Sequence, residues 1–486
     1  MTREELIKII SENKGKVVEL SNVNLSGEHL KGLDLTGIKL RNSDLSGMDL
    51  SEAILDNADL SFCIMKETKL INTSIKNSNM QGTNLTKIDA RDADFSNANL
   101  QEVNMTSATI ENANFTGCIM IKANLTGVNA KEATFDTVRA NGINLTGALL
   151  YRASFVNSNM EYANLSESDL RGADLSGATL KGVNIKKSLL TEVSLRKIFM
   201  PSTDLRDVNL SGLDLSEAVI TSAQMSNVKL MDVNLRGANL EGSQLDFAQL
   251  SGAILDYAKL DKAAFNGATL ERASMQNASC INTNFSAANM KGTIITHAIM
   301  SRANLKEANL SGAVITHSNL SYADLTGANL SNSDLRESNI EGAMLHNTIL
   351  TNAQISSRIA KSVCSWCGYK QETKDICEHC GKTINIPGPV VKTIALFVIL
   401  PIISLISGPL IFIINGFQAF NINLIPLKMG ALIFQVGMVL TLLNLIASLI
   451  IITILWHKPL IEGTGYIKGS VSIALISILA YMIILI

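Results

Sequence analysis

Four cysteines in the last third of the 486-residue chain carry the clearest chemistry in the sequence. They form two C-x-x-C-G motifs, with nine residues between the pairs, at Cys364, Cys367, Cys377 and Cys380. Two such pairs are typical of zinc sites, because four thiolates complete a tetrahedral shell. Such a shell leaves no position open for a substrate, so we predict a structural Zn2+ in a small zinc ribbon over residues 358–386. A redox dithiol pair and unrelated free thiols remain the alternatives.

A second group of candidate residues recurs at an interval of twenty. Residues 292–297 read Gly-Thr-Ile-Ile-Thr-His, and residues 312–317 read Gly-Ala-Val-Ile-Thr-His. The simplest interpretation is a local duplication of one structural unit. Aligned Ile and Val beside His would be unusual on a solvated wall, which favours a protein contact. A metal site is least favoured, because two His without a carboxylate or Cys nearby make a poor ligand set. The candidate interaction patch comprises Ile294, His297, Val314 and His317.

An unusual periodicity must position these residues. Every fifth residue from Leu25 to Ile355 is apolar, and almost all of them are Leu, Ile, Met or Phe. A second series, two residues earlier, is mostly small, and the residue between the two series is usually Asn or Asp. A period of five fits neither an α-helix nor a flat strand. It fits a chain that turns a corner every five residues, with both apolar series pointing inward.

The repeated unit A-(N/D)-L-(S/x)-(G/x) resembles the pentapeptide-repeat family. The resemblance implies a mainly β fold, a right-handed quadrilateral parallel β-helix with four pentapeptides in each coil of 20 residues, here over residues 20–357. The sequence supports a 20-residue coil independently of the family, because four phenylalanines are spaced by twenty and would stack on one wall. They are Phe95, Phe115, Phe135 and Phe155.

Both ends of this solenoid and one internal site depart from the pattern. Thr2 and Glu5 predict a capping box, so we expect a helix over residues 2–12 that caps the first coil from within residues 1–19. Between residues 195 and 204, Phe199 falls at an outward position and is followed by Pro201, which cannot donate to a ladder. We expect a bulge or a bend there, with Phe199 exposed or tucked over it.

Residues 387–486 are predicted to form an α-helical membrane domain. Three apolar runs, at about 393–414, 429–456 and 467–486, each reach the roughly 20 residues that cross a bilayer. Lys and Arg are concentrated before the first run and between the second and third runs. By the positive-inside rule, the solenoid and zinc ribbon would face the cytoplasm of a bacterial inner or plasma membrane, with the C-terminus outside.

Composition argues against several classes of function. Residues 20–357 hold 28 Lys and Arg against 35 Asp and Glu, a net charge of −7. This is no basic nucleic-acid groove, and it falls short of the dense acidity of a DNA mimic. Asp and Asn recur because the repeat accommodates them, so no nucleophile, phosphate loop or carboxylate cluster escapes the pattern. We therefore expect no enzyme and no catalytic residue, and we expect Cys63, Cys118 and Cys280 to be small buried hydrophobes.

The combined prediction is a membrane-anchored, non-catalytic scaffold that presents a protein-interaction surface to a cytoplasmic protein partner. One alternative, which the family resemblance implies, is protection of a topoisomerase by imitation of DNA. The other is an oligomeric channel or transport component. The sequence leaves the partner's identity and homo-oligomerisation open.

Overall fold

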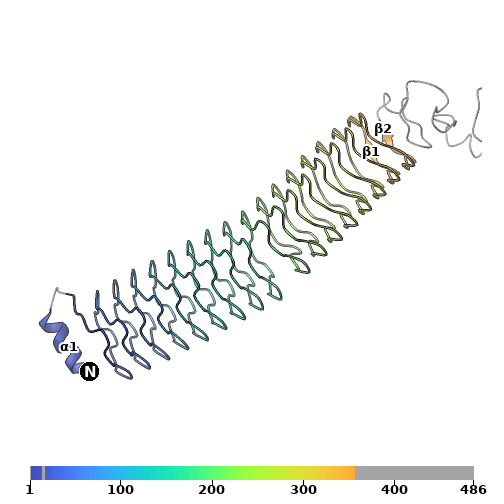
Figure 1. Cartoon of the computed structure of the whole chain (residues 1–486). Coiled ribbons are helices and arrows are strands. Elements are labelled where there is room, and N and C mark those ends of the chain that lie inside the picture. Colours follow the sequence, from blue (N-terminus) through green and yellow to red (C-terminus); the bar gives the residue numbers. More distant parts are fainter. Residues whose placement is uncertain (1, 14–16, 356–486) are drawn as a thin grey trace, which may run out of the picture. The chain divides into compact units, whose positions relative to one another are not determined.

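The computed structural model describes residues 2–13 and 17–355 of the chain. It begins with helix α1 (Arg3–Glu12) and continues as a stack of four-sided coils (Figure 1). The last two coils carry the short strands β1 (Asp334–Leu335) and β2 (Gln354–Ile355), which pair in parallel. The 20-residue coil is confirmed, because isolated parallel bridges join residues twenty apart from Glu19–Lys39 onward.

Backbone hydrogen bonds run between neighbouring coils in a constant register. Leu25 N donates to Asp44 O at 2.8 Å, and Asp44 N donates to Val23 O at 2.9 Å. The same two contacts recur along the stack, once on each side of each coil. Each coil therefore pairs the backbone edge of the coil before it, which leaves regular edges only at the two ends.

The corners explain why the repeat contains Asn or Asp and Gly. The second residue of each turn has a φ near +60°, a conformation that Gly and Asn adopt most readily, as at Gly27 and Asn22. The Asn or Asp two residues before the turn's first residue accepts a hydrogen bond from that residue's amide. Asp34 Oδ1, for example, accepts from Thr36 N at 3.0 Å. Hydrogen bonds from the Thr36 hydroxyl and amide hold the pKa of Asp34 below its ordinary value.

The core consists of stacked side-chain ladders. The four predicted phenylalanines are fully buried and stack almost parallel, with ring centroids 4.8–4.9 Å apart. Phe265 and Phe285 form a second, shorter stack. The three solenoid cysteines are buried as expected, and desolvation raises the pKa of the Cys63 thiol to about 11 and that of Cys118 to about 12.

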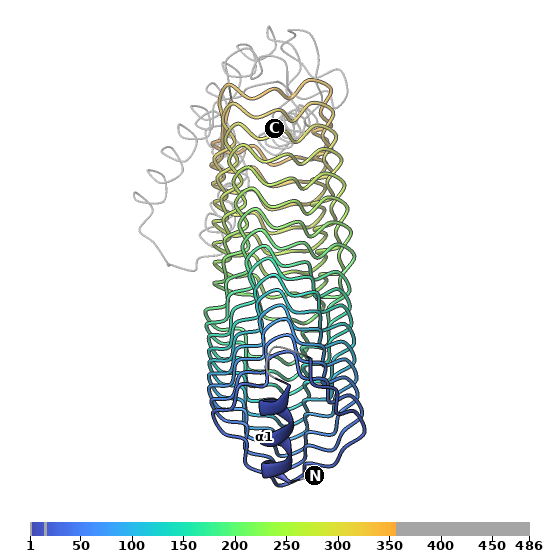
Figure 2. The ribbon, with the colours of Figure 1, turned by 90° about the vertical axis from the view of Figure 1, so that its left-hand side faces the viewer.

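Helix α1 lies at the N-terminal end of the solenoid, as expected for a cap (Figure 2). The capping box is confirmed, since Glu5 N donates to Thr2 Oγ1 and Thr2 N donates to Glu5 Oε2. Leu6 is fully buried, and Arg3 N donates to Glu28 Oε2 at 3.2 Å. The helix therefore covers core surface that the first coils would otherwise expose.

The prediction of an integral membrane protein is wrong for the part of the chain that the structure describes. Its one α-helix, α1, has ten residues, well short of the roughly 20 needed to cross a bilayer. None of the described helices is long and apolar enough to span a membrane. The three apolar runs within 387–486, and the predicted zinc ribbon at 358–386, lie outside the described residues.

The regular ladder is interrupted at one place within residues 19–355. The bridges Asn184–Asp204 and Leu189–Asn209 are missing, although the bridges Ser194–Asp214 and Phe199–Val219 on the other two sides are present. The coils are therefore parted on two adjacent sides and held together on the other two. We call this interface, between residues 183–193 and 203–214, the open seam.

The expected irregularity is thus confirmed, but the reason given for it is wrong. Phe199 is 42% exposed, as predicted. Pro201, however, occupies the first turn position, where the amide of other coils bonds a side chain instead of the ladder, as Ser26 N bonds Asn24 Oδ1. The neighbouring amides Met200 N and Ser202 N keep their ladder bonds to the following coil. Proline therefore costs the ladder no donor here.

Crowding of the small inward series accounts for the seam better. On one wall Val193, Leu213 and Val233 follow one another in three successive coils, where most coils have Ala, Ser or Thr. On the neighbouring wall Val208 stands above Ser188. Isolated branched residues such as Ile143, flanked by Ala123 and Ala163, leave the ladder intact. Extra volume stacked on extra volume forces close-packed layers apart.

Candidate interaction surface

The predicted patch is brought together on one side and one corner of two adjacent coils. Ile294 and Val314 are bridge partners, and their side chains are 40% and 37% exposed. Two apolar side chains on an outward position usually occupied by Ser, Asp or Asn form a small, dry step on the wall.

The two histidines stand at the adjoining corner. Both occupy the turn position with positive φ, at +59° for each, and both are exposed. Their ring centroids are 4.9 Å apart at 84°, an edge-to-face arrangement. Their backbones are also linked, since His297 N donates to Thr316 O. The rings form one continuous surface with the Ile294–Val314 step.

Sequence reasoning missed neighbours that enlarge this surface. Ile299, on the far side of the histidine corner, is 44% exposed. Two coils earlier, Ile254 is 41% exposed on the same side as Ile294, and Tyr257 is 53% exposed on the same corner as His297. The spacing of 40 between Ile254 and Ile294 was the available signal. We call Ile254, Tyr257, Ile294, His297, Ile299, Val314 and His317 the apolar–histidine surface.

One ion pair borders this surface in the next coil. Arg336 Nη2 lies 2.7 Å from Asp334 Oδ2, and Arg336 Nε also donates to the same carboxylate. Arg336, followed by its backbone amide and the charge of His317, keeps the pKa of Asp334 below its ordinary value. The carboxylate is thus committed to Arg336, which makes it a poor third ligand for a metal held by the histidines.

Metal and thiol chemistry is not assembled elsewhere in residues 2–13 and 17–355. Within these ranges no group of three or more His, Cys, Asp or Glu is arranged to hold a metal ion. Cys364, Cys367, Cys377 and Cys380 lie outside the described residues, so the zinc site stays a prediction. The buried solenoid thiols have raised pKa values and no access for a reactant.

Exposed aromatic side chains elsewhere follow a packing rule that the sequence analysis did not detect. Where a Phe or Tyr occupies the positive-φ turn position, a Gly usually stands twenty residues later, and the ring lies over it. A Cβ on Gly182 would meet the Tyr162 ring at 2.7 Å, and one on Gly267 would meet Phe247 at 2.7 Å. Most scattered aromatics are therefore surface packing, whereas Tyr257 has Asn277 in the place of that Gly.

A family model described as pentapeptide repeats (8 copies) matches the solenoid. The matches together leave few gaps between residues 19 and 352, and they fall on 19–57, 53–89, 91–127, 111–147, 158–196, 202–237, 234–272, 263–302, 273–312 and 313–352. No curated protein matches this chain in sequence.

Solved structures of three repeat proteins are similar to parts of the chain. HetL, a pentapeptide repeat protein involved in heterocyst differentiation regulation in the cyanobacterium Nostoc sp. strain PCC 7120, is 26% identical, with 50% of this chain and 93% of HetL covered and a TM-score of 0.22. QnrB1, a plasmid-mediated fluoroquinolone resistance protein, is 16% identical over 42% of this chain and 90% of its own, with a TM-score of 0.24. A pentapeptide repeat protein of the Arabidopsis thaliana thylakoid lumen is 21% identical over 34% and 81%, with a TM-score of 0.12. Scores this low carry no argument about function.

Proposed function

Since this chain belongs to the pentapeptide-repeat family and its solenoid is a right-handed β-helix, we propose that it is a non-catalytic scaffold that presents the apolar–histidine surface to a protein partner. The observation that carries the proposal is the stacking of Ile294 on Val314 beside the paired rings of His297 and His317.

The energetics favour a protein over a small ligand. Exposed aliphatic and aromatic groups that gather within four successive coils gain free energy when a partner covers them, at about 25 cal/mol per Å² of apolar area. The backbone beneath them is fixed by ladder bonds on both sides, so the surface loses little conformational entropy on binding. Polar groups at its border, such as the hydroxyl of Thr296 and the amide of Gln276, suit the wet rim of a protein interface.

The proposal is tested by affinity capture with the full-length protein and a patch variant. The variant replaces Ile294, His297, Val314 and His317 by Asn, a residue that other coils carry at both kinds of position, as at Asn114 and Asn277. The matched control is Ile54→Asn, which removes an isolated Ile that is 40% exposed on the same side of a distant coil. We expect specific partners to be lost with the patch variant and kept with the control. Identical partners for all three proteins would refute the assignment.

We also propose that Cys364, Cys367, Cys377 and Cys380 bind one structural Zn2+. The support is the donor set itself, since two C-x-x-C-G pairs supply four soft thiolate ligands and glycines that permit tight turns after the second Cys of each pair. Zinc would supply folding free energy that a segment of about 20 residues cannot obtain from a core.

Metal analysis of the full-length protein tests this second proposal. We expect one zinc per chain, lost when Cys377 and Cys380 are replaced by Ser and kept when Cys118 is replaced by Ser, because Cys118 is buried in the solenoid. Zinc content that is zero in the native protein, or unchanged in the Cys377→Ser, Cys380→Ser variant, would contradict it.

A further inference from the structure

The open seam presents unpaired backbone groups on two facing edges. In other coils each of these positions donates to or accepts from the neighbouring coil. Here the amides of seven residues make no hydrogen bond: Ile185, Lys187, Leu190 and Glu192 on one edge, and Asp204, Asn209 and Asp214 on the other. Unpaired backbone donors and acceptors are costly to leave unmatched, and they form a template for another strand.

The side chains that line the seam are also less covered than the rest of the core. Leu190 is 8% exposed, Val208 7%, and Ile185 and Leu213 5% each, whereas most core residues are at 0–2%. Ser188 is the one position of the small series between residues 38 and 338 that is not fully buried. An entering side chain would therefore meet apolar surface between the two edges.

Positive charge is concentrated around the seam. Residues 181–206 hold six Lys and Arg against two carboxylates, Glu192 and Asp204, a net charge of +4. The remainder of residues 20–357 holds 22 Lys and Arg against 33 Asp and Glu, a net charge of −11. The six cations are Lys181, Lys186, Lys187, Arg196, Lys197 and Arg206.

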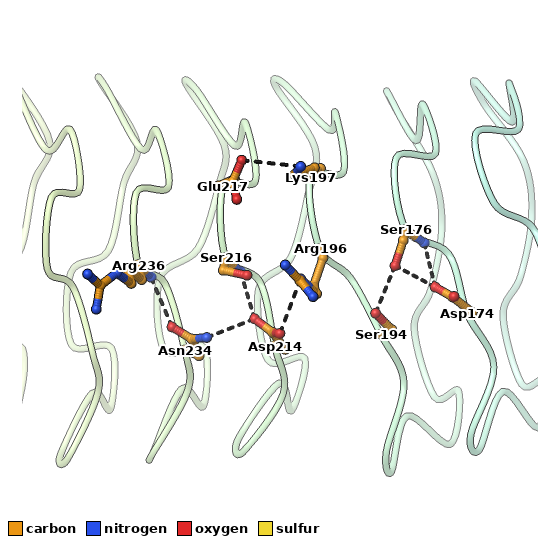
Figure 3. A network of polar contacts seen from close by, with 10 residues as sticks. All are labelled: Asp174, Ser176, Ser194, Arg196, Lys197, Asp214, Ser216, Glu217, Asn234 and Arg236. Atoms are coloured by element: carbon orange, nitrogen blue, oxygen red, sulfur yellow. Dashed lines mark hydrogen bonds and ion pairs between the residues drawn. The ribbon is translucent and has the colours of Figure 1, made fainter.

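Ion pairs hold the coils together beside the seam without replacing its backbone bonds. Lys186 Nζ reaches Asp204 Oδ2 across it at 2.9 Å, and these two side chains are 50% and 36% exposed. On the closed sides, Arg196 and Lys197 reach Asp214 and Glu217 of the following coil (Figure 3). Exposed pairs of this kind contribute little stability, so another carboxylate can replace the partner of Lys186.

From these observations we propose that the open seam binds an extended, acidic peptide segment of another protein as an added β-strand. Alternate side chains of such a strand point to opposite faces. One set would cover Ile185, Leu190 and Leu213, and the other would place carboxylates beside Lys181 and Lys186. Main-chain hydrogen bonds to the unpaired amides would supply much of the affinity, as in other cases of strand addition. This site is separate from the apolar–histidine surface.

The test uses the full-length protein and an N-acetylated ten-residue peptide that alternates Val and Glu. Because main-chain bonds dominate the proposed contact, the outcome does not depend on one particular sequence. We expect saturable binding, with slower hydrogen exchange at the amides of Ile185, Leu190 and Asn209. N-methylation of alternate peptide amides should weaken binding at least about tenfold, since three lost hydrogen bonds at about 0.5–1.5 kcal/mol each exceed that factor. A Val–Lys peptide should not bind.

Variants of the protein complete the test. Lys181→Glu with Lys186→Glu should weaken binding about tenfold, while the control Lys259→Glu with Lys262→Glu, on an intact ladder, should not. Equal binding of the N-methylated peptide, protection that appears elsewhere, no binding at about 1 mM peptide, or seam amides that are already protected in the peptide-free protein would each overturn the proposal.

Discussion

Leu213→Ala is predicted to behave unlike an ordinary core truncation. Leu213 lies between Val193 and Val233 in the small inward series, next to the two sides on which the coils part. A Leu→Ala change in a core usually destabilises a protein by about 2–5 kcal/mol. Here the smaller side chain also allows the coils to approach, and seven unpaired amides can recover hydrogen bonds worth about 0.5–1.5 kcal/mol each. The two effects are of similar size, so the net change in unfolding free energy should be near zero or favourable.

The matched control is Leu215→Ala in the same coil. Leu215 is fully buried in the large inward series, and its backbone already donates to Asn234 O at 2.8 Å, so its truncation relieves nothing. Urea unfolding should show a loss of about 2–5 kcal/mol for Leu215→Ala only. Hydrogen exchange should show new protection at Leu190 and Asn209 for Leu213→Ala only. Equal destabilisation by both variants, with the seam amides still exchanging fast, would refute crowding as the cause.

Three further predictions concern single ladders, corners and charges. Phe115→Ala should cost more than Phe95→Ala in urea unfolding, by about 0.5–1.5 kcal/mol, because the first loses two ring stacks and the second loses one; equal losses would contradict this. Gly267→Ala should destabilise more than Gly147→Ala, because both have positive φ but only the first new Cβ meets an aromatic ring, and a thermal melt that ranks them the other way would be evidence against the packing rule. Hydrogen bonds from a neighbouring guanidinium and a lysine hold the pKa of Asp204 well below its ordinary value, so its contribution is present above about pH 4 and is lost as pH falls further; Asp204→Asn should lower the urea midpoint at pH 7 and leave it unchanged at pH 2.5.

The periodic part of the fold was predictable because one physical rule repeats. The apolar series from Leu25 to Ile355, the 20-residue spacing of the phenylalanines and the Thr2–Glu5 capping box each correspond to a feature of the structure. Such signals depend only on which residues share a face, and a fixed period determines that completely.

The open seam was located from the sequence, but its mechanism was not. Attention fell on Pro201 because proline lacks an amide donor, yet the ladder needs no donor at that turn position. The relevant signal was the vertical neighbour, since Leu213 matters only because Val193 and Val233 stand below and above it. Contacts twenty residues apart have to be examined column by column, and the same holds for the rings of Tyr162 and Phe247 over their glycines.

The candidate patch was predictable for the same reason that a duplication is visible in the sequence. Ile294 with Val314 and His297 with His317 were identified as stacked pairs, and the structure has both. Ile299 was missed because it lies around the corner, on a side that the duplicated hexapeptide does not reach. Which molecule covers the patch depends on surfaces outside this chain.

Site-specific photo-crosslinking from residue 316 tests the central claim most directly. Thr316 precedes His317 at the corner of the apolar–histidine surface, and Thr116 occupies the same corner ten coils earlier, with Gly117 in the place of the histidine. Both threonines are half-buried, which makes them matched positions for a photoreactive amino acid. A discrete protein crosslinked from residue 316 and not from residue 116, and lost in the Asn patch variant, is the result that the account predicts. Crosslinks that are the same from both positions, or that persist in the patch variant, would contradict it.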